Sequence, residues 1–421
     1  MSTFKTNRIS IAEFALFIYA FVTVFFKTIP SIGLYTRYFG YMLLIAFAVD
    51  LLRDRRHLAI KPLELRLLVP WVGFLIVLFY HGLASPELRS IVFSLIQTIV
   101  LFILCFRLMY YRGRAEPIIL GLFCGFVALM PYVLMNRGMM VSTGGADAQQ
   151  MFFSVSGDAE RGMNPNVMGT WLNMGLSLFV YLFVVKRFHI RSRVVRVAYL
   201  WSLLGFYAWV AFLVLIVLGS RQSQIYFVIN SVAMIVLFTR ARITIQSVVL
   251  SIGAATFLSI PFIYFLVNSP FFKRFEEMYL YLIGGNTVVD NSIMYRIDMI
   301  IKAISMFFER PIVGFGPYGF MLHSGFFAYS HNHYAELLSC YGFIGASSFI
   351  ALYLSIIYMS FKLVFWGWSG MREIGVWGLF SMTGLMFSHM ARPADTDKYY
   401  YIFLSVVLAI IAKNYSQYRR G

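Results

Sequence analysis

Long, uninterrupted apolar runs limit how this chain can fold more than any other feature. Of its 421 residues, 60% are hydrophobic and only 13% are charged. A water-soluble domain cannot bury that much apolar surface, so lipid must be the solvent of this chain. The runs are continuous and close to the ~20 residues that a helix needs to cross the hydrocarbon core. We therefore expect an all-α, polytopic membrane protein that forms a single transmembrane domain over residues 1–421.

The runs predict about twelve transmembrane helices. They lie near residues 11–26, 34–52, 67–84, 91–106, 117–135, 167–185, 197–218, 222–239, 243–267, 334–361, 374–391 and 399–412. Lys5 and Arg8 precede the first run, which lacks a small-residue cleavage site, so we expect it to stay as an anchor. No internal repeat is visible, which counts against transporter folds built from two related halves.

Basic residues orient these helices. Short segments such as 53–56, 112–114 and 191–196 carry most of the Lys and Arg residues and lie on one side of the predicted bundle. By the positive-inside rule that side is cytoplasmic, and both termini lie there. The sequence pI of 9.8 follows from this topology and does not indicate binding to nucleic acid. We expect a multi-pass protein of the bacterial inner (cytoplasmic) membrane.

Two predicted outer connections, 136–166 and 268–333, are much longer than the others. Long connections in a compact protein usually carry function or are disordered. Within the second, residues 291–308 form an amphipathic pattern that predicts a helix lying flat on the outer membrane surface. Its apolar positions are Ile293, Ile297, Ile300, Ile304 and Phe307. The sequence Glu309-Arg310-Pro311 should end this helix.

Polar residues that could carry chemistry gather on the outer side. Arg221 lies between two apolar runs, where a charge is costly unless it is paired or serves a site. The alternative is an arginine that extends its charge to the interface. Arg296 lies on the predicted surface helix, where a solvated face or an ion pair with Asp298 would also explain it.

Two histidines precede the run at 334–361. His333 and Glu336 are three residues apart on one helical face, but no third zinc ligand falls at a typical spacing. A general base is the better interpretation of His331, because the ordinary pKa of imidazole lies near neutral pH.

Two further patterns resemble known motifs. Residues 314–319 match G-x-G-x-x-G, but they follow a surface helix and contain a proline. A dinucleotide site is therefore not expected, and we interpret the segment as a flexible outer loop. Asp395 and Asp397 resemble the acidic pairs that hold a divalent metal in many glycosyltransferases. The first outer loop, where membrane glycosyltransferases generally carry such pairs, has no carboxylate here, and the role of this pair stays open.

Four motifs in order resemble a known family. His331-Asn332, nine residues, and Gly342-x-x-Gly345 are similar to the H-N-x9-G-x-x-G signature of bacterial O-antigen ligases. The other three are Arg161-Gly162-Met163-Asn164-Pro165-Asn166, Gly219-Ser220-Arg221 and the Pro-x-x-Gly-x-Gly stretch at 311–316. The long outer connection before the last three runs and the helix count also match this superfamily of ligases and polymerases.

The resemblance implies a metal-independent, inverting glycosyltransferase of GT-C type that needs no cofactor. Its donor would be a glycan on undecaprenyl diphosphate, and its acceptor a sugar hydroxyl of lipid A–core. His331 would be the general base, and Arg221 and Arg296 would bind the diphosphate. Asn332, His333 and Asn166 would support them; Arg161, Arg274 and Arg310 are the further candidate cations. The active site would lie on the periplasmic face.

Two alternatives stay open. O-antigen and capsule polymerases share this donor and these motifs but transfer to a second lipid-linked glycan. A lipid-glycan transporter would also suit about twelve spans, but its path would be lined by ionisable residues within several of them. Most runs here contain none, which favours a transferase over a transporter.

Overall fold

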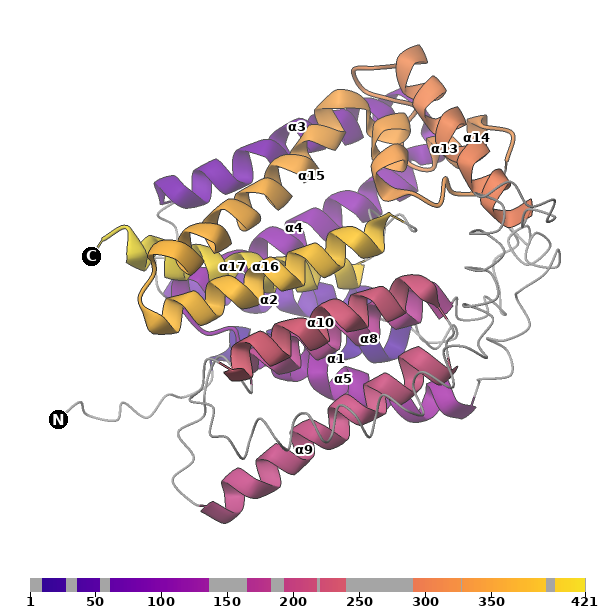
Figure 1. Cartoon of the computed structure of the whole chain (residues 1–421). Coiled ribbons are helices and arrows are strands. Elements are labelled where there is room, and N and C mark those ends of the chain that lie inside the picture. Colours follow the sequence, from indigo (N-terminus) through magenta and orange to yellow (C-terminus); the bar gives the residue numbers. More distant parts are fainter. Residues whose placement is uncertain are drawn as a thin grey trace.

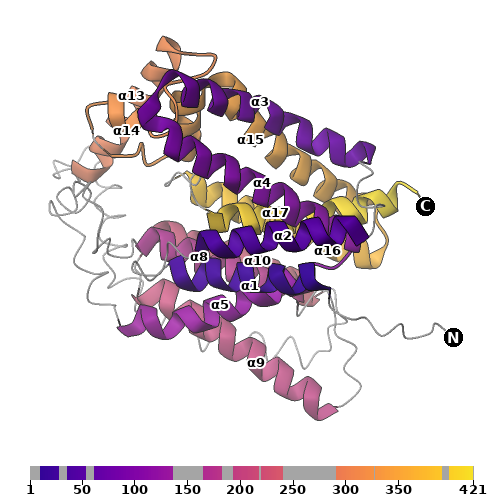
Figure 2. The same ribbon diagram turned by 180° about the vertical axis from the view of Figure 1, so that it is seen from behind.

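A computed structural model of the chain describes residues 10–27, 36–53, 61–135, 165–182, 193–217, 220–239, 291–326, 328–390 and 398–420. All the regular structure in these ranges is helical. In Figure 1 the helices pack side by side, and α13 and α14 lie at the end of the bundle opposite the C-terminal end of α17. The reverse view shows α1, α2 and α4 covering the other side (Figure 2).

The helices are long and apolar. They are α1 (Ile11–Lys27), α2 (Thr36–Arg53), α3 (Pro62–Ala84), α4 (Arg89–Arg112), α5 (Glu116–Met135), α8 (Pro165–Val180), α9 (Arg193–Phe212, followed by a π-helical segment Leu213–Val217), α10 (Arg221–Thr239), α13 (Asn291–Glu309), α14 (Gly319–His323), α15 (His333–Trp366), α16 (Ser369–His389) and α17 (Lys398–Tyr418). Every predicted run overlaps one of them except 243–267, which lies outside the described residues.

Among the described residues, four segments are long and apolar enough to cross a membrane: Pro62–Ala84, Pro86–Arg112, His333–Trp366 and Lys398–Tyr418. Shorter apolar helices, among them α1, α5 and α10, accompany them. The all-helical, multi-pass membrane fold is therefore confirmed. The exact number of spans and the side on which each loop lies stay predictions.

Helix α17 forms the centre of the bundle. All residues from Tyr399 to Ala412 are buried, and α4, α15 and α16 pack around this helix. A helix that is apolar on every side is expected in such a position. Aromatic rings join α3 to its neighbours, since Trp71 lies 5.1 Å from Phe102 on α4 and 5.2 Å from Phe349 on α15 between ring centroids.

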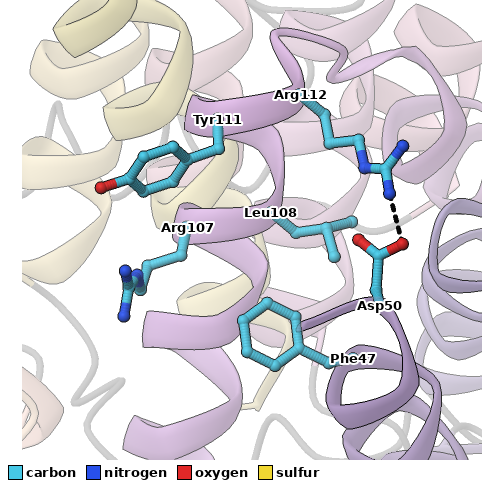
Figure 3. A pocket seen from close by; sticks show the side chains of 6 residues that line it. All are labelled: Phe47, Asp50, Arg107, Leu108, Tyr111 and Arg112. Atoms are coloured by element: carbon cyan, nitrogen blue, oxygen red, sulfur yellow. Dashed lines mark hydrogen bonds and ion pairs between the residues drawn. The ribbon is translucent and has the colours of Figure 1, made fainter. Parts of the chain in front are cut away.

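Charged side chains meet at the end of the bundle where α1 and α3 begin and α2 and α4 end. Arg107 lies 2.6 Å from the buried carboxylate of Glu64, and Arg112 pairs with Asp50. Figure 3 shows the hollow beside this second pair, with Arg107 pointing to the other side of α4. Its volume is only about 10 Å³, room for one water molecule. These charges fasten helix ends together and form no substrate-sized cavity.

Helix α13 lies across the ends of the bundle helices (Figure 1), as a surface helix should. It occupies the range predicted for the amphipathic helix and ends at Glu309. Met299, Ala303 and Met306 are buried, and α13 packs against α15. These positions follow the i, i+4, i+7 spacing of one helical face. Because α13 packs against α15, Arg296 on α13 and His331 before α15 lie on the same side of the bundle.

Candidate active site

His331 lies in a tight turn immediately before α15. Its backbone has φ of 56°, the left-handed region that non-glycine residues rarely adopt. Hydrogen bonds fix the turn on both sides: the Ser330 amide donates to Glu336 Oε2 at 2.6 Å, and Ser330 Oγ donates to the Asn332 carbonyl at 2.8 Å. A strained backbone held in this way is typical of functional sites.

Asn332 caps α15. Its side-chain oxygen accepts hydrogen bonds from the amides of Tyr334 and Ala335 at 3.0 and 3.1 Å. Asparagine is among the preferred capping residues because it satisfies amides that lack partners within the helix. The cap fixes where the helix begins, and thereby places the neighbouring His331 turn.

The imidazole of His331 is held as a neutral ring. Its ring centroid lies 4.3 Å from that of Tyr329, and its Nδ1 is buried with no hydrogen-bond partner among the described residues. Burial, and next the positive charge of Arg296, lower the pKa of His331 from 6.5 to about 4. At neutral pH this ring therefore carries no charge, and its Nδ1 makes no hydrogen bond to the described residues.

Arg296 reaches His331 from α13. Its side chain is exposed, and no ion pair joins it to a carboxylate within the ranges that the structure describes. The adjacent Tyr295 packs its ring 5.1 Å from that of Phe326, which holds this end of α13 beside the segment leading to His331. Two of the predicted site residues thus come together from separate elements.

Helix α15 is interrupted at Gly342, which has φ of 61° and ψ of −164°. The interruption frees backbone groups that the loop after α13 satisfies. The Ser339 and Cys340 carbonyls accept from the amides of Phe315 and Gly316, at 3.0 and 2.6 Å. In return, the amides of Phe343 and Ile344 donate to the Pro311 and Ile312 carbonyls, at 2.7 and 3.2 Å. Buried backbone groups need such partners, so the loop and the interrupted helix stabilise each other.

Two glycines make this contact possible. A Cβ on Gly342 would lie 2.5 Å from the Ile312 carbonyl, and one on Gly314 would lie 2.5 Å from the Cys340 carbonyl. His81 on α3 also binds the loop, with Nε2 donating to the Val313 carbonyl at 2.9 Å. The expectation of a flexible loop at 314–319 is therefore wrong, because buried backbone pairing fixes its first half. The glycines serve close backbone contact and left-handed φ, not nucleotide binding.

The last turn of α16 connects the regions of Arg221 and His331. Gln222, the residue after Arg221, donates through its side-chain amide to Ser388 Oγ at 2.8 Å and to the Ser388 carbonyl. From the other side, Asn332 Nδ2 donates to the Met390 carbonyl at 3.4 Å. Tyr334 adds a bond from its hydroxyl to the Met386 carbonyl at 3.1 Å. The start of α10 and the start of α15 are therefore fastened to the same helix end.

His333 faces the buried core. Its Nε2 lies 3.4 Å from the Tyr353 hydroxyl, which is also 3.1 Å from His389 Nδ1 and bonded to the Tyr400 hydroxyl. Because the side chain of His333 is fully buried, it supports the fold around the site and does not contact a substrate directly.

Residues 206–350 match the O-antigen ligase family, and this range includes Arg221, Arg296 and His331. This match supports membership of the O-antigen ligase superfamily. It also supports, in general terms, ligase-type or polymerase-type activity on lipid-linked glycans. No curated protein matches the chain.

The structure describes only some of the remaining predicted site residues. Arg161, Arg274, Asp395 and Asp397 lie outside the described residues. Arg221 is the first residue of α10 and Asn166 the second residue of α8, and the structure describes only their backbones. Arg310 is exposed, with its guanidinium 4.5 Å from the ring centroid of Phe315. Within the described part of the chain, no three His, Cys, Asp or Glu side chains are grouped to hold a metal ion.

Several residues that position this site were not predicted from the sequence. Glu336 was considered only as a zinc ligand, yet its carboxylate holds the Ser330 amide. Gln222 and Tyr334 anchor the two helix starts to α16. A glutamine at the start of an apolar helix is a signal that could have been used, since polar side chains in spans usually bond across helices.

Proposed function

We propose that this chain is a metal-independent, inverting glycosyltransferase of the ligase type. It would move a glycan from undecaprenyl diphosphate to a sugar hydroxyl of lipid A–core on the periplasmic face of the inner membrane. One observation carries the proposal: a half-buried, neutral imidazole, His331, has its pKa lowered further by the charge of an exposed guanidinium, Arg296.

The guanidinium suits the leaving group. A diphosphate departs as a stable anion, so it needs positive charge more than it needs a proton. Arginine binds phosphate oxygens through two parallel hydrogen bonds and keeps its charge at any physiological pH. Arg296 is exposed and can accept this ligand. The anchoring of Gln222 and Asn332 to α16 supports Arg221 as the second cation.

The imidazole suits the acceptor. A sugar hydroxyl attacks the anomeric carbon on the side opposite the departing diphosphate, so the configuration inverts. As the new C–O bond forms, the hydroxyl proton passes to Nδ1 of His331. With a pKa of about 4, the free protein offers a weak base. A diphosphate bound at Arg296 would offset the charge that lowers this pKa, so the base strengthens when donor is present.

The acceptor separates the two candidate activities. The family match supports ligase-type and polymerase-type activity alike, and we propose lipid A–core as the acceptor. A polymerase would use the same donor site and the same base but would extend a second lipid-linked glycan.

The test uses purified protein, an undecaprenyl-diphosphate oligosaccharide and EDTA, with lipid A–core present or absent. We expect transfer to lipid A–core, and we expect His331→Ala to lower its rate by about 10²–10⁴-fold. His323→Ala, an exposed histidine on α14, is the matched control and should retain activity.

Other outcomes would redirect the assignment. Lengthening of the donor without lipid A–core would identify a polymerase. A requirement for added divalent ion would contradict the metal-independent mechanism and make Asp395 and Asp397 the residues to test. Absence of product under every condition would favour transport.

A further inference from the structure

Helix α13 has a second apolar face in addition to the one that packs against the bundle. Met299, Ala303 and Met306 are buried, whereas Ile297, Ile301, Ile304 and Phe308 are 42–74% exposed. At about 100° per residue, the exposed set lies on the side of the helix opposite the buried set. We call these four residues the outer face of α13. An exposed apolar face of this kind marks a contact with lipid or a partner.

Two further exposed apolar residues follow α13. Ile312, which is 64% exposed, lies in the loop after this helix, and Phe343, which is 67% exposed, lies on α15. They are adjacent because the Phe343 amide donates to the Pro311 carbonyl and the Ile344 amide to the Ile312 carbonyl. Phe343 belongs to α15, a helix apolar enough to cross the membrane. The apolar residues after α13 thus lie beside a helix that is apolar enough to span the membrane.

The charges around this face are asymmetric. On the helical wheel, Arg296 falls alone on one flank between the buried set and the outer face, and its side chain is exposed. The other flank carries two exposed carboxylates, Asp298 and Glu309, and one partly exposed ammonium, Lys302. An anionic group is therefore attracted to the Arg296 flank more than to the other. The same flank carries the guanidinium that acts on His331.

We propose that the outer face of α13, continued by Ile312 and Phe343, binds the polyprenyl chain of the donor. This inference rests on the proposed function. The diphosphate lies at Arg296, and the chain follows the isoleucines toward Phe343. A polyprenyl diphosphate attaches its charge directly to one long apolar chain, which matches a cation at the edge of one apolar stripe. Isoleucine side chains are branched and stiff, so they form fixed ridges against which a methyl-branched chain can pack.

A phospholipid is the competing occupant. It also joins a phosphate to apolar chains, but a glycerol separates them and two chains must be accommodated. The stripe on α13 is one helix face wide, and Arg296 directly precedes Ile297 in sequence. The single-chain lipid is therefore the better match.

The test is photolabelling of the full-length protein in nanodiscs with an undecaprenyl diphosphate that carries a diazirine on its chain. We expect label on peptides covering residues 297–312, suppressed by excess undecaprenyl diphosphate and not by the same amount of phosphatidylglycerol. The double variant Ile304→Asn, Phe308→Asn should lower this labelling at least about fivefold. Phe365→Asn, an exposed apolar position at the opposite end of α15, is the control and should label like the wild type.

Equal suppression by phosphatidylglycerol would overturn the inference, and so would unchanged labelling of the double variant. Labelling needs no acceptor and no glycan transfer. Loss of transfer with intact labelling would therefore contradict only the proposed function. Retained transfer without α13 labelling would contradict only the polyprenyl site.

Discussion

Burial, and next the positive charge of Arg296 on the transverse helix α13, lower the pKa of His331 in the turn before α15. The two residues come from separate elements, and the packing of α13 against α15 brings them into electrostatic contact. Because a bound anion at Arg296 would relax this effect, the pair links occupation of the donor site to the strength of the base.

The pH dependence of transfer should show this link. His331 must be neutral to accept a proton, so kcat/KM for the donor should rise as pH increases through about 4 and be flat above it. In Arg296→Gln the inflection should move up but stay below 6.5, since a charge that disfavours protonation is removed while burial, the larger cause, remains. The measurement is the pH profile of kcat/KM at fixed acceptor. A wild-type inflection near 6.5 that Arg296→Gln leaves in place would contradict the pairing.

Gly342 should not tolerate a side chain. Gly342→Ala forces alanine into a backbone conformation (φ 61°, ψ −164°) that is almost restricted to glycine, which costs about 1–3 kcal/mol. Overlap with the Ile312 carbonyl adds about 1–3 kcal/mol or more. We expect a clear fall in Tm in detergent. Gly325→Ala is the matched control, because Gly325 also has a positive φ (84°) but its Cβ would meet open space. If Tm falls equally in both variants, close contact with the loop is not the reason that position 342 requires glycine.

Gln222 should position the start of α10. Gln222→Leu removes the bonds to Ser388 and frees the helix turn that carries Arg221. We expect KM for the donor to rise about tenfold, with a smaller change in kcat at saturating donor, because a binding cation is displaced. Gln224→Leu is the control, since its amide makes only a 3.5 Å contact with the Leu215 carbonyl. Equal effects of the two substitutions would point to a general loss of helix packing.

Asn332 should contribute to stability through its cap. Asn332→Ala should destabilise the protein by about 1 kcal/mol, and Asn332→Ser by less, because serine also caps. Both lose the bond from Nδ2 to the Met390 carbonyl, so both should lower activity. Thermal unfolding and transfer rates measured on the same preparations separate the two contributions. Full activity of the serine variant would show that the tie to α16 is dispensable.

The elements that sequence predicts well are those in which solvent decides the outcome. Apolar runs near 20 residues must become helices in lipid, because no other local structure satisfies their backbone groups. The range of α13 was likewise evident from its apolar spacing. The range 334–361 also predicted a helix, but as one continuous span.

The break at Gly342 could not be predicted in this way. Hydropathy does not record which backbone groups pair across the chain, and the partners here are a loop that sequence alone described as flexible. For the same reason, the contacts at the end of α16 could not be predicted. There Gln222 donates to the Ser388 carbonyl and Asn332 to the Met390 carbonyl. Candidate residues were visible from their charge, but the contacts that position them depend on tertiary structure.

The interruption of α15 has a mechanical consequence. A continuous helix moves as a rigid unit. When such a helix tilts to match the thickness of a bilayer, its end is displaced. At Gly342 the hydrogen-bond ladder stops, and the first segment, His333–Tyr341, is tied sideways to the loop after α13. The position of His331 relative to the bundle is thus set by protein contacts. When the membrane thickness changes, the part of α15 after Gly342 can tilt without displacing the histidine.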